Sequence, residues 1–322
     1  MKKLTSLLLC VVLVLSLCSV TAGAAQNVGA EARVAVVNDT VTVVVCTKQA
    51  ATNARLDVTF DSDCLTYNGY ETVFTVHSAK VGTEQVTIGL ANSSANPVAA
   101  GGELAVLTFK TVGTWEETSV TVTAWGEDIS LTVKAGGQRF VDVAPGEWYH
   151  DAVEIMAAHG YINGISATHF GPALDMNRAS FVTLLGRLDG VGASYAETDF
   201  TDVEVESFYS GYVAWAVEKG ITTGISQTMF APAASINRAQ MVTFLYRYAQ
   251  YKGMDVSVGD PAAILGAYSD GEAVCAIDWA AEPFAWAVKN GIINGMEGAL
   301  NPNGTANRAQ VAVMLYRFFF EA

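Results

Sequence analysis

Three arginines recur at the same place in a repeated motif, directly after an asparagine and before a run of mostly apolar residues. They are Arg178 in NRAS, and Arg238 and Arg308 in two copies of NRAQ. Asparagine is a favoured N-cap residue, and a glutamine three positions later can complete a capping box, so each motif predicts the start of a helix. Capping explains the asparagine and the glutamine, and it leaves the arginine unexplained.

Each arginine is expected where a positive charge is mildly unfavourable. In the first turn of a helix it adds to the positive end of the helix dipole, at a cost of about 0.3–1 kcal/mol. A guanidinium beside the free N–H groups of that turn can instead bind a carboxylate or a phosphate. The alternative is structural, because each arginine can pair with an acid of a neighbouring repeat: Asp142, Asp202 or Asp270. The sequence leaves both interpretations open.

The arginines belong to three copies of one unit, which begin at residue 140 and share landmarks at near-constant spacing. An aromatic residue follows each aspartate, at Trp148, Phe208 and Trp279. A glycine then precedes each arginine by 14, 14 and 13 residues, at Gly164, Gly224 and Gly295. The pattern predicts a helix, a loop and a second helix in each unit. A single apolar stripe cannot be buried alone, so we expect the three units to pack into an all-α pseudo-three-fold bundle.

The region before the repeats has a different period. Short β-branched stretches alternate apolar and polar residues, with Gly, Asn, Asp and Ser between them, which is typical of an antiparallel β-sandwich. We therefore expect an all-β domain over residues 27–134, separated from the repeats near Gly136 and Gly137. The expected strands cover residues 34–37, 40–45, 54–60, 72–76, 85–91, 103–110 and 119–125.

The first 24 residues resemble an export signal. A basic start, an apolar centre and a final Ala-Gly-Ala predict a secretory signal peptide over residues 1–24. Its removal would take the formal charge from −14 to −16, because two lysines and no acids are lost. This charge argues against nucleic acid and anionic membranes as bulk partners. No other stretch has the roughly 20 apolar residues that a membrane span needs.

The cysteines and histidines point to no redox, metal or catalytic site. Cys46, Cys64 and Cys275 form an odd set at unrelated spacings, so we expect buried free thiols, with a Cys46–Cys64 pair as the alternative. The acidic stretch 61–63 lacks the later ligands of a calcium loop and is expected to be a turn. The four histidines do not recur across the repeats, and neither G-x-S-x-G nor H-E-x-x-H occurs. We therefore expect no enzymatic activity, cofactor or metal.

Residues 139–322 resemble three S-layer homology domains in tandem, at 139–191, 199–252 and 266–322. The shared features are F-x-D-V, a W/F-Y pair, a G-x-x-x-G turn, F-x-P and a helix opening similar to I-T-R-A-E. The resemblance implies non-covalent attachment to secondary cell-wall polymer, often pyruvylated, at the surface of a Gram-positive-type bacterium. The polymer would lie in grooves between the repeats. The implied site residues are Arg178, Arg238, Arg308, Gly164, Gly224, Gly295, Trp148, Phe208, Trp279, Asp142, Asp202 and Asp270.

The repeats depart from the family pattern in ways that bear on this site. Asparagine replaces the threonine of the motif, and the acid is replaced by Ser180, Gln240 and Gln310. The third repeat has Leu300 in place of phenylalanine and three extra residues before its tryptophan. We therefore expect unequal use of the grooves, with Arg238 as the strongest ligand candidate. The aromatic residues rank below the arginines, because such side chains are more often core than ligand platforms.

The N-terminal region resembles the cohesin family in two stretches, ARLDVTFDSDCLTY and GGELAVLTFK. The resemblance implies a jelly-roll-like sandwich that binds dockerin modules of secreted proteins. One alternative is a carbohydrate-binding sandwich displayed on the wall, for which Trp115 and Trp125 are the candidate aromatic residues. Another is a structural S-layer subunit. The sequence does not decide among these ligands.

Overall fold

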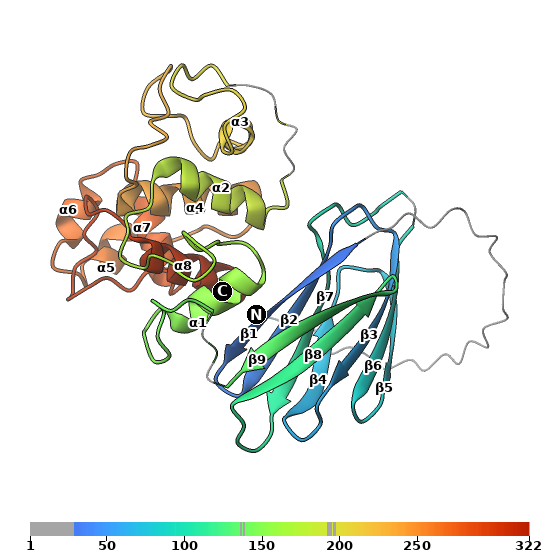
Figure 1. Cartoon of the computed structure of the whole chain (residues 1–322). Coiled ribbons are helices and arrows are strands. Elements are labelled where there is room, and N and C mark those ends of the chain that lie inside the picture. Colours follow the sequence, from blue (N-terminus) through green and yellow to red (C-terminus); the bar gives the residue numbers. More distant parts are fainter. Residues whose placement is uncertain are drawn as a thin grey trace.

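The computed structural model describes residues 29–321, except 94, 136, 138, 192–194, 196 and 197. The expected signal peptide, residues 1–24, lies outside the described residues. The described chain forms a β half followed by a helical half (Figure 1).

The β half is a sandwich of two antiparallel sheets. One sheet has the strand order β1-β2-β7-β4, and the other has the order β5-β6-β3-β8-β9. Inward-facing residues such as Val43, Leu56 and Phe109 are fully buried between the sheets. The strands are β1 (Ala30–Val37), β2 (Thr40–Thr47), β3 (Asn53–Phe60), β4 (Leu65–Glu71), β5 (Val76–Val81), β6 (Gln85–Ala91), β7 (Glu103–Thr111), β8 (Glu117–Ala124) and β9 (Glu127–Lys134).

The expected β-sandwich is confirmed, but four of its details were wrong. Residues 72–75 are not a strand: they connect β4 to β5, and the apolar residue of that stretch, Phe74, is buried in the core. Strands β4, β5 and β9 were not expected. All three lie at sheet edges. An edge strand pairs on one side only and is often polar, so its alternation is weak. All six side chains of β5 are exposed.

The helical half contains a helix, a loop and a second helix in each repeat, as expected. These pairs are α1 (His150–Ala158) with α2 (Arg178–Leu188), α3 (Ser210–Glu218) with α4 (Arg238–Tyr251), and α7 (Ala281–Lys289) with α8 (Arg308–Tyr316). Two short helices, α5 (Pro261–Leu265) and α6 (Gly271–Cys275), occupy the longer third repeat, and a π-helix, η1 (Arg317–Glu321), follows α8. The second helices supply the centre of the core, where Phe181, Leu245 and Leu315 are fully buried.

The first helix of the first repeat packs against the sandwich. Helix α1 lies beside β1 and β2, and its Ala158 forms a small buried cluster with Ala35, Val44 and Cys46. His159 Nδ1 lies 2.6 Å from Glu103 Oε1, and the Arg139 guanidinium donates to the Val34 carbonyl at 2.8 Å. We call these contacts the domain junction. It buries the outer side of β2, which explains why nearly all of that strand is buried on both faces.

The cysteines are free thiols. Cys46 is buried in the domain junction, whereas Cys64 and Cys275 are partly exposed. The Cys46–Cys64 alternative is therefore wrong, and full burial holds for Cys46 alone. The acidic stretch 61–63 is a turn after β3, in which Asp61 Oδ1 accepts from the Asp63 N–H at 2.9 Å. The turn interpretation is confirmed.

Candidate functional site

The asparagines cap the second helices as predicted. Asn237 Oδ1 accepts from the Gln240 N–H at 2.8 Å, and the Gln240 side chain accepts from the Asn237 N–H, which completes a capping box. The third repeat has the same box, whereas Asn177 only accepts from the Ser180 N–H. The motif arginine is the first residue of each helix, so its side chain leaves the helix start toward another repeat.

Each motif arginine donates a hydrogen bond to a carbonyl oxygen of the next repeat. The donor is Nε in every case, and the acceptor follows the Gly-x-x-x-Gly loop. The bonds join Arg178 to Phe230 at 2.9 Å, Arg238 to Leu300 at 2.7 Å, and Arg308 to Phe170 at 2.9 Å. The third bond returns from the last repeat to the first, so the three repeats form a closed cycle.

The aspartates hold the same loop residues from the other side. Asp202 accepts from the N–H groups of Phe230 and Ala231 at 2.9 and 2.7 Å, and Asp142 and Asp270 do the same in their own repeats. Arg178 and Asp202 are therefore joined through Phe230 and form no direct ion pair. The expected pairing of each arginine with an acid of a neighbouring repeat is therefore indirect, because a loop residue links the two charges.

A second cycle of hydrogen bonds runs through the backbone before each asparagine. The Met176 N–H donates to Ala306 at 2.9 Å, the Ala306 N–H to Ile236 at 3.1 Å, and the Ile236 N–H to Met176 at 2.8 Å. Each residue is the one that precedes a capping asparagine. The three helix starts are therefore gathered at one place, which brings the motif arginines close to the loops of other repeats.

One cavity lies beside the second of these arginines. It has a volume of about 370 Å³, and we call it the Arg238 groove. All three repeats contribute: Arg238 from the second, Gly295 from the third and Trp148 from the first. Helix α8 and its end add Gln310, Val313, Met314 and Arg317.

A matching cavity lies beside the third arginine. This Arg308 groove has a volume of about 240 Å³ and is lined by Arg308, Gly164 of the first repeat and Phe208 of the second. Helix α2 adds Ser180, Thr183, Leu184 and Arg187. The two grooves therefore use corresponding positions, each shifted by one repeat. Three of the four predicted site residue types, the arginine, the glycine and the aromatic residue, meet in these grooves, while the aspartates lie behind the loops.

Both grooves carry two arginines and no carboxylate among their lining residues. The second arginine of each, Arg187 or Arg317, was not among the predicted site residues. The sequence did contain a signal for them. Arg187 follows Ser180 by seven residues and Arg317 follows Gln310 by seven, which places each pair on one helix face. Because serine and glutamine replace the acid of the family motif, the grooves contain positive charge without a built-in counter-charge.

The glycines are required by the packing of the loops. Gly224 and Gly295 have φ values of +77° and +76°, which favour glycine. At Gly164 an added Cβ would lie 2.5 Å from the carbonyl oxygens of Ser166 and His169. These glycines shape the groove walls.

The aromatic residues at the repeat starts are exposed. Trp148, Phe208 and Trp279 have 62%, 66% and 50% of their surface accessible. They were ranked below the arginines because such side chains are more often core, and their exposure removes that reason. Tyr149 and Tyr209 pack edge-on against the first two rings, with centroids 5.2 and 5.1 Å apart. The neighbouring tyrosines pack toward the core, which leaves the preceding aromatic side chain on the surface.

Burial lowers the pKa of all three motif arginines. It lowers the pKa of Arg178 to about 10, although the nearby Asp202 carboxylate acts in the opposite direction. Burial also lowers the pKa of Arg238 and Arg308, opposed by Asp270 and Asp142. Because a pKa of about 10 lies well above neutral pH, the Arg178 guanidinium remains charged.

The S-layer homology domain family matches residues 139–182, 199–242 and 276–312. The helical half of this chain therefore contains three S-layer homology domains. The chain is 30% identical over 171 residues to the surface-layer 125 kDa protein of Lysinibacillus sphaericus, covering 52% of this chain and 14% of the relative. It is 28% identical over 170 residues to exoglucanase XynX of Acetivibrio thermocellus, covering 52% and 15%. The chain thus spans only about a seventh of these relatives.

The sandwich is similar in structure to cohesin modules. A cohesin module of a Clostridium perfringens family 33 glycoside hydrolase is 16% identical and covers 34% of this chain and 97% of that module, with a TM-score of 0.26. The cohesin CaCohA2 of Clostridium acetobutylicum is also 16% identical, with coverages of 35% and 84% and a TM-score of 0.27.

Two absences within the described residues concern membranes and metals. Within this part of the chain, no helix combines the length and the apolar character that crossing a bilayer requires. In the same residues, no three side chains of His, Cys, Asp or Glu are grouped as metal ligands.

Proposed function

We propose that the three S-layer homology domains anchor this protein to an anionic polysaccharide of the cell wall, and that carboxylates such as pyruvyl ketals enter the Arg238 and Arg308 grooves. One observation carries the proposal. In a chain of formal charge −14, two cavities at corresponding positions are each lined by two arginines and by no acid. Such a site attracts an anion locally, whereas the rest of the surface repels it.

The side chains around each groove suit a charged sugar. Within the described residues, the Arg187 guanidinium has no hydrogen-bond or ion-pair partner, so its donors are available to a carboxylate. The exposed rings of Phe208 and Trp148 stand at the groove walls and offer apolar faces to a sugar ring. The closed hydrogen-bond cycles support a pseudo-three-fold arrangement, which would repeat this chemistry around the helical half.

The test is co-sedimentation with purified wall sacculi. The double variant Arg187→Gln/Arg317→Gln removes the second arginine of each groove. It keeps the motif arginines, whose hydrogen bonds link the repeats. A lost charge-assisted hydrogen bond is worth about 1.5–3 kcal/mol, so binding should weaken by roughly tenfold or more. Arg55→Gln, on the sandwich, removes one exposed positive charge outside the grooves and should sediment like the parent. Unchanged sedimentation of the double variant would overturn the proposal, and sacculi stripped of secondary polymer should retain neither protein.

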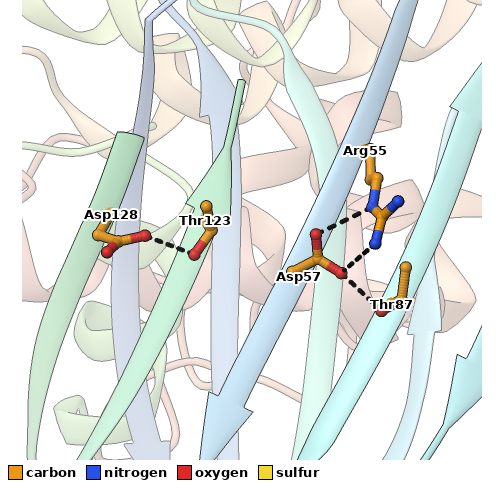
Figure 2. A network of polar contacts seen from close by, with 5 residues as sticks. All are labelled: Arg55, Asp57, Thr87, Thr123 and Asp128. Carbon is orange, nitrogen blue, oxygen red and sulfur yellow. Dashed lines mark hydrogen bonds and ion pairs between the residues drawn. The ribbon is translucent and has the colours of Figure 1, made fainter. Parts of the chain in front are cut away.

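We further propose that the sandwich presents the outer face of its five-stranded sheet to a protein partner, for which a dockerin module is the candidate. The four-stranded sheet is covered by α1 on its outer side. The other sheet carries a polar network instead (Figure 2): Arg55 and Thr87 donate to Asp57 at 2.9 and 2.6 Å, and Thr123 donates to Asp128. A polar face of this kind is compatible with a non-obligate protein interface.

The carbohydrate-binding alternative for the sandwich has weaker support. Trp115 and Trp125 both pack against the apolar core, so neither belongs to an exposed aromatic row. Titration with purified dockerin modules of the same organism tests the proposal. Replacement of Arg55 and Asp57 by alanine should weaken a real interaction, whereas Lys110→Ala, on the four-stranded sheet, should not. Binding of a neutral oligosaccharide in place of every dockerin would favour the alternative.

A further inference from the structure

We infer that Phe244 closes the remaining groove, the one around Arg178, which we call the Arg178 groove. This chain therefore binds two anionic saccharide units rather than three. The inference rests on the proposed function of the grooves and specifies which of them are open. It follows from comparing corresponding positions of the three repeats.

The composition of the Arg178 groove follows from that of the other two grooves. Each open groove takes its motif arginine from one repeat, its glycine and its second helix from the next repeat, and its aromatic residue from the remaining one. With Arg178 as the arginine, the same rule gives Gly224, helix α4 and Trp279. The hydrogen bond from Arg178 to Phe230 confirms that the first repeat reaches the second in this way.

One helix position differs among the three grooves. Six residues after the start of the second helix, the lining residue is Leu184 in the Arg308 groove and Met314 in the Arg238 groove. In α4 this position is Phe244, which is 5% exposed. Its ring lies over the arginine, with Arg178 Cζ 5.2 Å from the ring centroid. Phenylalanine therefore lies against the guanidinium at the position that lines a cavity in the other two repeats.

A second aromatic ring also packs against the Arg178 guanidinium. Arg178 Cζ lies 4.7 Å from the centroid of Phe230, so the guanidinium contacts two aromatic rings. Arg178 is only 2% exposed, and its Nη2 is buried without a hydrogen-bond partner. Cation–π attraction can offset part of that cost. A carboxylate that entered this groove would have to displace the Phe244 ring first.

The other two arginines remain open to a ligand. Arg308 contacts one ring, Phe170, at 4.6 Å, is partly exposed, and borders the Arg308 groove. Arg238 is 4% exposed, and it lines a cavity of about 370 Å³. At the positions of the two rings around Arg178, this repeat pair has Leu300 and Met314. Burial alone does not close a groove, and the aromatic residue at position 244 distinguishes the closed one.

Reciprocal substitutions test the inference by binding stoichiometry. Isothermal titration with a pyruvylated methyl hexoside should give two sites for the parent protein. Phe244→Met, which installs the residue of the Arg238 groove, should give three, and Met314→Phe should give one. Three sites in the parent protein, or two sites in a folded Phe244→Met variant, would overturn the inference.

A second measurement does not depend on the ligand. Phenylglyoxal modifies accessible arginines, and mass spectrometry reads each site. In the parent protein we expect Arg178 to react at least about tenfold more slowly than Arg308, because access requires local opening of the groove. Phe244→Met should remove most of this difference. Equal rates in the parent would overturn the inference even if the saccharide failed to bind, whereas failure of binding with the expected rates would count against the proposed function alone.

Discussion

Arg308 and Phe170 are 138 residues apart in sequence, yet Arg308 Nε donates to the Phe170 carbonyl oxygen at 2.9 Å. The guanidinium also lies 4.6 Å from the centroid of the Phe170 ring. This contact joins the last repeat to the first and closes the cycle that Arg178 and Arg238 begin. The motif arginines therefore hold the repeats together, whatever they contribute to binding, and their replacement affects folding as well as affinity.

The closing contact should contribute measurably to stability. Arg308→Ala leaves the Phe170 carbonyl without its donor and removes the cation–π contact, so we expect a loss of about 2–3 kcal/mol in the free energy of unfolding. Urea denaturation followed by far-UV circular dichroism measures it. Arg187→Ala is the matched control, because that guanidinium has no hydrogen-bond or ion-pair partner among the described residues, and its effect should stay within about 0.5 kcal/mol. Equal losses in the two variants would contradict a structural role for Arg308.

Stability should also depend on acid through Asp142. Burial alone would raise the pKa of this carboxyl, but the N–H groups of Phe170 and Gly171 outweigh it and hold the pKa below the ordinary 3.8. A depressed folded-state pKa means that the stabilisation is complete above the ordinary value and is lost as the pH falls through the folded-state value. Asp142→Asn should therefore be less stable at neutral pH, and its difference from the parent should shrink as the pH approaches 2.

The same urea denaturation, repeated at several pH values, tests this dependence. Asp63→Asn provides the control, because that carboxylate is exposed in the turn after β3. A difference between parent and Asp142→Asn that stayed constant from neutral to acid pH would show that the carboxylate charge does not hold the loop.

The local features of the site were predictable, and its long-range partners were not. Capping boxes and the first-turn position of the arginine depend on residues three apart, so the sequence alone predicts the contact between Asn237 and Gln240. The acceptors of the arginines are backbone carbonyls, which every residue possesses. No side-chain pattern could therefore single out Leu300 as the partner of Arg238.

The omissions in the fold have a similar cause. The strands that were missed lie at sheet edges, where one pairing partner and polar side chains weaken the alternation. Phe74 was assigned to a strand because it is apolar among β-branched residues, but it is buried as part of the connection from β4 in one sheet to β5 in the other. The domain junction was not expected at all, because His159 and Glu103 are 56 residues apart and belong to different halves.

The domain junction predicts an unreactive thiol. Burial raises the pKa of Cys46 to about 12, and the thiolate is the reactive form. Iodoacetamide at pH 8 should therefore modify Cys64 and Cys275, which are partly exposed, well before Cys46. Mass spectrometry of the peptides gives each rate, and dilute urea should accelerate Cys46 as the protein unfolds. Rapid native labelling of Cys46 would show that the sandwich and α1 separate readily in solution.

Gly160 offers a direct test of the same junction. It ends α1 with φ +73°, and an added Cβ would overlap the Arg33 guanidinium of β1. Gly220 and Gly291 occupy the corresponding positions of the other repeats, with φ +70° and +69°, and open space surrounds an added Cβ there. Alanine at each position should cost about 1–2 kcal/mol for the left-handed backbone. Only Gly160→Ala should also disturb the contact between the two halves.

Small-angle scattering should then show a larger radius of gyration for Gly160→Ala than for Gly220→Ala or Gly291→Ala. Identical profiles for the three variants would mean that Arg33 moves aside and that the junction does not depend on the glycine.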